Sequence, residues 1–189
     1  MLDYYNKLPH YVIIKNEKFI INSDFRIFIE FELEMQGTNK EKAIENALRQ
    51  FYPAFFQIIK KNLLNEAIEK FIWFYKCGKE EYNTNNVKSS KYNKKTSQIF
   101  NYRYDCDLIC GSYMIYAHID LHKYCHWWKF KEIWNSLPND CEFNKIKGYR
   151  AYDGDDKNML ELKEFYKLPP TEEEIKDELR RKEIYEALK

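Results

Sequence analysis

Histidine and cysteine side chains gather in one short part of the sequence, where they could bind a metal ion. The stretch AHIDLHKYCHWW contains three histidines spaced four residues apart and one cysteine: His118, His122, His126 and Cys125. Cys106 and Cys110 form a C-x-x-x-C pair shortly before it. Zinc binds thiolate sulfur and imidazole nitrogen in a tetrahedral arrangement, which this set could supply. The corresponding function would be that of a small zinc-binding regulator.

The spacing argues against this zinc site. Asp120 is expected to interrupt a helix between His118 and His122, so the histidines would not share one face. The pattern also corresponds neither to a C-x-x-C knuckle nor to an H-E-x-x-H pair. Small thiols packed between two helices are the simpler interpretation. We therefore expect no bound metal and no cofactor, and the zinc-binding regulator is the weaker alternative.

The sequence carries no signature of catalysis. It has no G-x-S-x-G elbow, no P-loop and no dinucleotide fingerprint. Cys125 and His126 are adjacent, so on a helix their side chains diverge and cannot form a nucleophile–base pair. The stretch YDGDDKN, with Asp153, Asp155 and Asp156, lacks the glycine and the final glutamate of a calcium loop, and we expect a turn there. The sequence predicts that the protein is not an enzyme.

Aromatic residues are concentrated in YCHWWKFKEIW, residues 124–134. If the stretch is helical, one row of side chains contains Trp127, Phe130 and Trp134. A second row, about a third of a turn away, contains Leu121, Tyr124 and Trp128. An apolar arc of this width is typical of a central core helix, and its outer row could also contact a partner.

We therefore take five residues as candidates for partner binding. They are Tyr124, Trp128 and Trp134 in the aromatic stretch and Ile175 and Leu179 near the end of the chain. The last two belong to a charged segment that is predicted to be a helix with a thin apolar stripe: Ile175, Leu179, Ile184 and Leu188. Such a helix would project from the body or become ordered on a partner.

Hydrophobic periodicity predicts a mainly α-helical protein with a small N-terminal β-hairpin over residues 11–22. The next stretch, FRIFIEFELEM, alternates as a strand would but contains three glutamates, so its pattern leaves strand and helix open. About six or seven helices are expected in all, and clear ones are predicted over 38–52, 62–78, 106–118, 121–137, 139–148 and 172–189.

The predicted organisation is a single helical domain over residues 1–168, followed by a charged helix over 169–189. Residues 79–97 are polar, rich in asparagine and lysine, and almost free of aliphatic side chains. This composition predicts a mobile loop within the domain.

The overall composition limits the classes of partner. The chain has 189 residues with 31 basic and 30 acidic side chains, a balance that argues against binding to a nucleic-acid backbone. No apolar run approaches the roughly 18 residues of a membrane span. The first residues lack a secretory pattern, so the 5 cysteines are expected to be reduced thiols in a cytoplasm. We expect neither nucleic acid nor membrane as a partner.

Four segments resemble one known family. LPHYVIIKNEKFIINSDFRIFIEFE, residues 8–32, resembles the opening of the bacteriophage gene-product-fifteen family, in which a short hairpin leads into an N/S/T-D-F-R helix. IWFYKCGKEE, residues 72–81, resembles its W-F-Y-x-C-G segment. FNYRYDCDLICGSYMIYAHIDL, residues 100–121, resembles its Y-D-x-D-x-I helix. HWWKFKEIWNSLPNDCEFNKIKGYRAYD, residues 126–153, is similar to its H-W-W-K-F and K-I-x-x-Y-R signature.

The resemblance implies a helix at residues 24–36 and a role in building a phage tail. Genes of this family lie near those for the tail tube and the tape-measure protein. Its members resemble tail-assembly chaperones, which keep the long helical tape-measure protein soluble in the host bacterial cytoplasm. The partners expected are the tape-measure protein, other tail-assembly proteins and a second copy of the chain. The alternative is a structural tail or tail-completion component that is retained in the particle.

Overall fold

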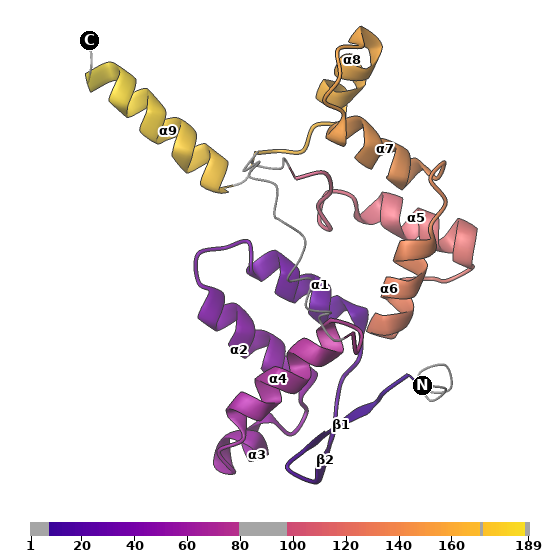
Figure 1. Ribbon diagram of the computed structural model, residues 1–189, viewed down its shortest axis with the longest axis vertical. Coiled ribbons are helices and arrows are strands. Elements are labelled where there is room, and N and C mark those ends of the chain that lie inside the picture. Colours follow the sequence, from indigo (N-terminus) through magenta and orange to yellow (C-terminus); the bar gives the residue numbers. More distant parts are fainter. Residues whose placement is uncertain (1–7, 80–97, 171, 188–189) are drawn as a thin grey trace, which may run out of the picture. The chain divides into compact units, whose positions relative to one another are not determined.

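The computed structural model describes residues 8–79, 98–170 and 172–187 of the chain. Within these residues it contains nine α-helices and one two-stranded antiparallel sheet (Figure 1). In chain order the elements are β1 (Tyr11–Ile14), β2 (Glu17–Ile20), α1 (Phe25–Glu34), α2 (Lys40–Phe51), α3 (Phe55–Lys60), α4 (Leu64–Tyr75), α5 (Cys106–Ala117), α6 (Trp127–Ser136), α7 (Glu142–Ala151), α8 (Lys157–Phe165) and α9 (Glu172–Ala187). The mainly helical class and the hairpin are confirmed, and the helix count is a little higher than predicted.

The chain divides into two compact units, which are described separately below. Unit 1 comprises Met1–Lys94 and Cys110–Pro138, and unit 2 comprises Lys95–Ile109 and Asn139–Lys189. The single domain over residues 1–168 stays a prediction. The loop predicted at residues 79–97 lies, apart from Lys79, outside the described residues.

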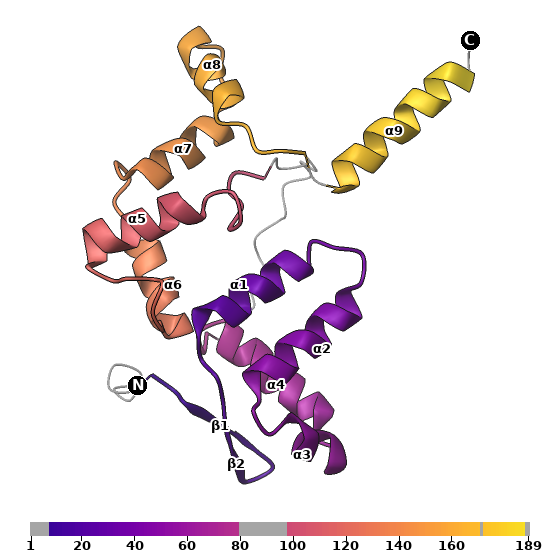
Figure 2. The same cartoon turned by 180° about the vertical axis from the view of Figure 1, so that it is seen from behind.

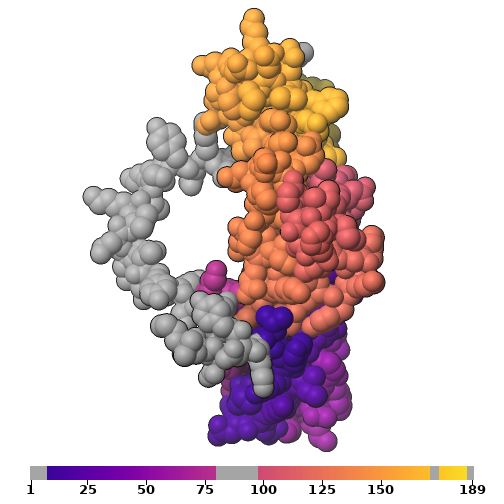
Figure 3. All heavy atoms as spheres, turned by 90° about the vertical axis from the view of Figure 1, so that its right-hand side faces the viewer, coloured from indigo at the N-terminus to yellow at the C-terminus, as the bar shows by residue number. Residues whose placement is uncertain are grey.

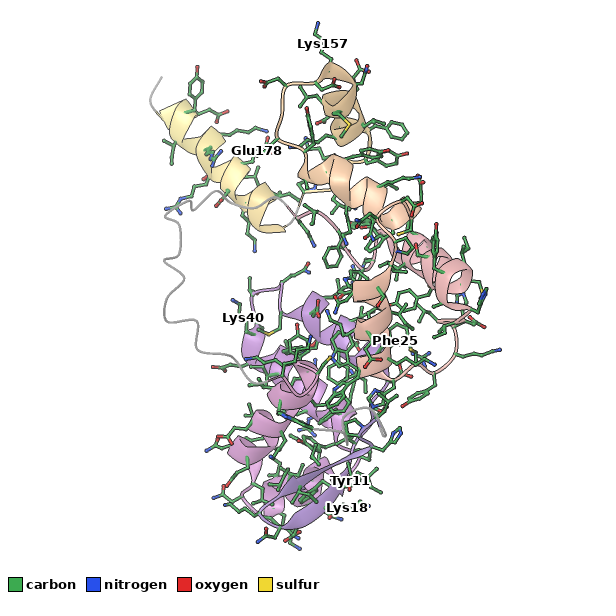
Figure 4. All side chains as sticks on the ribbon, turned by 45° about the vertical axis from the view of Figure 1, so that its right-hand side comes forward. Tyr11, Lys18, Phe25, Lys40, Lys157 and Glu178 are labelled. Carbon is green, nitrogen blue, oxygen red and sulfur yellow. The ribbon has the colours of Figure 1, made fainter. Side chains whose placement is uncertain are left out.

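The predicted hairpin forms because its turn residues adopt a left-handed backbone. Lys15 and Asn16 have φ values of 45° and 67°, as a two-residue type I′ turn requires, and Ile14 pairs with Glu17 across it. Val12 and Phe19 face the core, whereas Tyr11 and Lys18 face solvent, where the Lys18 ammonium lies 4.0 Å from the centre of the Tyr11 ring (Figure 4). The side-chain alternation of the sequence thus sets which face of the hairpin is buried.

The segment whose pattern left strand and helix open is the helix α1, as the family resemblance implied. Its N-cap is Asp24, whose carboxylate accepts a hydrogen bond from the Arg26 backbone N–H at 3.0 Å. Phe25 and Phe28, three residues apart, both point into the core of unit 1. The helical period therefore buries Phe28, which a strand would have placed on the face opposite Phe25.

Aromatic rings pack around Phe28, which is fully buried at the centre of unit 1. Its ring stacks on Trp127 with a centroid distance of 4.8 Å, and on Phe74 and Phe71 at 5.5 and 5.7 Å. The Phe51 ring meets it edge-on at 5.8 Å. Contacts from α1, α2, α4 and α6 thus converge on one side chain.

The helices α2 and α4 form where they were predicted. Asn39 caps α2 by accepting the Lys42 backbone N–H at 3.0 Å. The apolar bend after α2 contains the short helix α3, which was not predicted. The buried Tyr52 hydroxyl donates a hydrogen bond to the Ala67 carbonyl at 2.9 Å, and burial raises the pKa of Tyr52.

The helix predicted from residue 121 is shorter than expected, because α6 begins only at Trp127. His118, at a φ of 54°, follows the end of α5, and a turn leads on towards Tyr124. The backbone of the next residues is engaged elsewhere: the Cys125 carbonyl accepts from Phe25 N–H at 2.9 Å, and Trp127 N–H donates to the Ser23 carbonyl at 2.8 Å. Pairing with the start of α1 replaces the first turns of the predicted helix.

A buried ion pair holds unit 2 together. The Arg150 guanidinium contacts both carboxylate oxygens of Asp105 at 2.7 and 2.9 Å, and these side chains are 9% and 2% exposed. Arg150 also donates to the Ile99 carbonyl at 3.2 Å and to the Tyr166 carbonyl at 2.6 Å. One side chain therefore connects the segment before α5, the end of α7 and the end of α8.

Unit 2 departs from the prediction in two places. The helix predicted over 139–148 is α7, displaced towards the C-terminus, and the turn after it is shorter than expected. Asp156 caps α8 by accepting the Met159 N–H at 3.0 Å, a helix that the sequence analysis did not identify. The predicted final helix is present as α9 (Figure 2). None of the helices in the described part of the chain is both long enough and apolar enough to span a membrane.

Candidate functional site

The two adjacent tryptophans bind the C-terminal end of α4. The Trp128 indole N–H donates to the Phe74 carbonyl and the Trp127 indole N–H donates to the Tyr75 carbonyl, both at 2.8 Å. The last carbonyls of a helix lack a partner in a following turn, and the indoles donate to two of them here; the Phe74 carbonyl also accepts the Cys77 N–H. The two adjacent indoles therefore bind the carbonyls of two adjacent residues, Phe74 and Tyr75.

The end of α4 is built to receive these rings. Gly78 N–H donates to the Trp73 carbonyl and Cys77 N–H to the Phe74 carbonyl, both at 2.9 Å, which is the Schellman pattern. Gly78 has a φ of 69°, and a Cβ there would lie 2.9 Å from Cη2 of Trp128. A side chain at position 78 would therefore displace the tryptophan.

His126 positions the tryptophans by capping α6. Its Nδ1 accepts the Trp128 backbone N–H at 3.1 Å, so the proton is on Nε2, which lies 3.0 Å from the Pro9 carbonyl. The ring is buried, and burial lowers the pKa of His126. The neutral imidazole is the form that both hydrogen bonds require.

A surface hollow of ≈ 250 Å³ lies beside the tryptophans. It is lined by the end of α4 and by one face of α6: Tyr75, Lys76, Cys77, Lys79, Trp127, Trp128, Lys131, Glu132 and Asn135. Drug-sized ligands and cofactors occupy pockets of roughly 300–1,000 Å³. The hollow is therefore of a size to hold one or two side chains of another molecule.

The lining of the hollow carries an excess of positive charge. Three of its lining residues are lysines and one is a glutamate. The Lys131 ammonium lies 5.2 Å from the centre of the Trp127 ring and 6.0 Å from that of Trp134, so cation–π contacts hold it at the wall. Burial raises the pKa of the Cys77 thiol to about 11, which keeps it protonated at neutral pH. The site offers charge and an apolar wall, not a nucleophile.

The structure places the five candidate partner-binding residues in different settings. In unit 1, Trp128 is 4% exposed and belongs to the core, as the core-helix interpretation expected, whereas Tyr124 is 55% exposed and shares a 2.7 Å hydrogen bond with Ser23 Oγ. Trp134 is half-buried and packs on Phe130. In unit 2, Ile175 and Leu179 are exposed on α9. That these residues bind a partner stays a prediction.

Two expectations about side-chain rows need correction. Tyr124 precedes α6, so it does not form a helical row with Trp128. On α9, Ile184 lies about half a turn away from Ile175 and Leu179, so the expected apolar stripe is not continuous there. Residue Leu188, the last member of that stripe, lies outside the described residues.

The histidines and cysteines of the zinc hypothesis do not form a metal site. Within residues 8–79, 98–170 and 172–187 there is no group of three or more His, Cys, Asp or Glu side chains that could hold a metal ion. Both ring nitrogens of His126 are already engaged, and Cys125 is buried with its thiol 3.7 Å from the His126 carbonyl. The zinc-binding hypothesis is therefore not supported by the geometry.

The residues that line the hollow, Lys79 and Lys131 among them, were not among the candidates predicted from the sequence. A signal was available, because Trp128, Lys131, Glu132 and Asn135 follow the helical spacing of three, four and seven residues. The contribution of α4 could not be recognised in this way, since it comes from a segment about 50 residues earlier in the chain.

Comparison with known proteins gives one match. Residues 5–169 match the family model described as Bacteriophage Gp15 protein. Searches among curated proteins and among solved structures give no match. The matched range includes the hairpin, the end of α4 and the tryptophans of α6.

Proposed function

The chain belongs to the Bacteriophage Gp15 protein family, and from that premise we propose that it is a tail-assembly chaperone. It binds the tape-measure protein and keeps it soluble in the host bacterial cytoplasm while the tail is built. The role is one of binding without catalysis, and the protonated thiol of Cys77 is in keeping with this. Other tail-assembly proteins and a second copy of the chain are further partners in this proposal.

The observation that carries the proposal is the exposed apolar surface of α5. The helix CDLICGSYMIYA has a single charged residue, Asp107, and a helix of such composition is normally buried on all sides. Nevertheless Met114, Ile115 and Tyr116 are 47%, 66% and 47% exposed. Atoms of α5 form part of the face seen in Figure 3. Exposed apolar side chains on such a helix are suited to protein–protein contact, and a chaperone needs them to bind an apolar client helix.

Co-expression with the tape-measure protein of the same phage or prophage genome tests the proposal. We expect a soluble client that co-elutes with this protein on a sizing column. Ile115→Glu places a charge in the apolar surface and should return the client to the insoluble fraction. The control, Phe165→Glu, changes a side chain on α8 that is 79% exposed and should leave client solubility unchanged.

A client that stays insoluble beside the wild-type protein would overturn the chaperone proposal. The alternative is then a structural tail component, which remains in finished particles, whereas a chaperone is absent from them. Mass spectrometry of purified particles distinguishes these two functions.

A further inference from the structure

We infer that the hollow between the end of α4 and the outer face of α6 is a docking site for an acidic segment of the client protein. The inference rests on the proposed function, because the client is the tape-measure protein. The client would thus contact the protein at two places: at the apolar surface of α5 and, through acidic side chains, at the hollow.

The lysines of the hollow determine which sign of charge is expected on the partner. Lys76, Lys79 and Lys131 contribute three positive charges, and Glu132 contributes the single negative charge in the lining. A positively charged rim favours a negatively charged partner and disfavours a positively charged one. Carboxylates of aspartate or glutamate satisfy this requirement.

The position of the Lys131 ammonium makes it the central contact. The side chain is half-buried, and its ammonium is held between the rings of Trp127 and Trp134. A side chain that is already ordered loses little rotamer entropy when it forms an ion pair. Lys79, one residue after Gly78, is exposed and also lines the hollow.

The size and shape of the hollow favour a protein segment over a nucleic acid. At ≈ 250 Å³ the hollow accommodates one or two side chains. A phosphate backbone would need a track of positive charge beyond this single point, and the chain as a whole has a net charge of only +1. A single acidic side chain of a protein segment fits a hollow of this size lined by lysines.

Charge reversal at the hollow tests the inference. In the co-expression assay, the double variant Lys79→Glu/Lys131→Glu should bind the tape-measure protein about tenfold more weakly, and the loss should shrink as salt is raised. The matched control is Lys70→Glu/Lys129→Glu, which changes one exposed lysine on α4 and one on α6, both outside the lining of the hollow. It carries the same net charge and should bind as the wild type does.

A conservative variant separates charge from folding. Lys131→Arg keeps both the charge and the cation–π contact, so we expect near wild-type binding. Thermal unfolding of each variant, followed by tryptophan emission, shows whether the reversed lysines disturb the fold. A variant that melts early is replaced by Lys79→Gln/Lys131→Gln, for which a smaller loss of binding is expected.

The possible outcomes differ clearly from one another. If the wild-type protein fails to bind the tape-measure protein, the proposed function fails. If the wild type binds and the hollow variant binds equally well, only the docking inference is overturned. Two further results would overturn it by showing another occupant of the hollow. One is binding of a single-stranded DNA oligonucleotide that depends on Lys79 and Lys131; the other is a wild-type protein that is dimeric while the hollow variant is monomeric.

Discussion

The two units of this protein are stabilised in different ways. Unit 1 buries aromatic rings of α1, α2, α4 and α6 in one cluster centred on Phe28, and the indoles of Trp127 and Trp128 find backbone carbonyls there. In unit 2 none of the residues of α8 is buried, and the ends of its elements meet at the ion pair of Asp105 and Arg150.

This difference has consequences for robustness. Burial of aromatic surface is spread over many contacts and tolerates changes in salt and pH. A buried ion pair is stabilising only while both partners are present, because either charge left alone is costly in an apolar interior. We therefore expect the stability of unit 1 to depend most on substitutions that change side-chain volume, and that of unit 2 on substitutions that change charge.

The largest effect is expected from Phe28→Ala, which removes the centre of unit 1. Loss of a fully buried phenylalanine costs about 3–5 kcal/mol of unfolding free energy. Urea unfolding followed by tryptophan emission measures it, since all 4 tryptophans of the chain lie in unit 1. Phe165→Ala, at an exposed position, is the control and should change little; a cost below about 1 kcal/mol for Phe28→Ala would contradict this account.

Arg150→Ala tests unit 2 in the same way. It leaves the Asp105 carboxylate buried without its partner, and we expect a loss of about 3–5 kcal/mol. Arg150→Lys keeps the charge but cannot reach all the acceptors of the guanidinium, so its cost should be intermediate. Hydrogen exchange of the amides of α7 and α8 reports the change. Equal protection in Arg150→Ala and in the wild type would show that the ion pair does not hold this unit together.

Replacing a glycine by alanine should lower the free energy of unfolding at position 78 in unit 1 and raise it at position 148 in unit 2. Gly78→Ala forces a Cβ against Trp128 at a positive φ, and we expect a loss of about 1–3 kcal/mol. Gly148→Ala lies within α7 with nothing within 4 Å of the added atom, and should gain roughly 0.5–1 kcal/mol. Chemical denaturation of both variants measures the difference. If Gly78→Ala is neutral, the close packing of Trp128 on α4 is not required.

The smallest effect concerns His126 and depends on pH. Because burial holds its pKa below the ordinary value of 6.5, the unfolded chain takes up the proton first as the pH falls. The stability that neutral His126 contributes is complete above about pH 6.5 and declines below it by at most about 1.4 kcal/mol per pH unit.

Denaturation at about pH 7.5 and about pH 5.5 measures this decline. His126→Asn keeps a capping oxygen but cannot titrate, so its stability should depend less on pH over this range. An equal pH dependence in the variant and the wild type would rule out His126 as the group responsible.

Local patterns in the sequence were sufficient for many elements. The turn residues Lys15 and Asn16, the cap Asn39 and the periodicity of residues 62–78 each act over a few positions, and the structure has a hairpin and helices there. Likewise, the density of aromatic residues in 124–134 was enough to expect a core helix, and Trp127 and Phe130 are fully buried.

Tertiary contacts decided what local patterns could not. The start of α6 was displaced to Trp127 because the backbone before it pairs with the start of α1, about a hundred residues earlier. The candidate site has the same origin: its lysines come from α6 and from the residues just after α4, and they meet because the indoles of Trp127 and Trp128 bind carbonyls at the end of α4. The sequence by itself thus determined the class and the hairpin, and it favoured a core position for the aromatic stretch, since these follow from local geometry and apolar content. Which carbonyls those tryptophans bind, and the hollow that results, were decided only by the tertiary structure, because hydrogen-bond partners distant along the chain leave no periodic pattern.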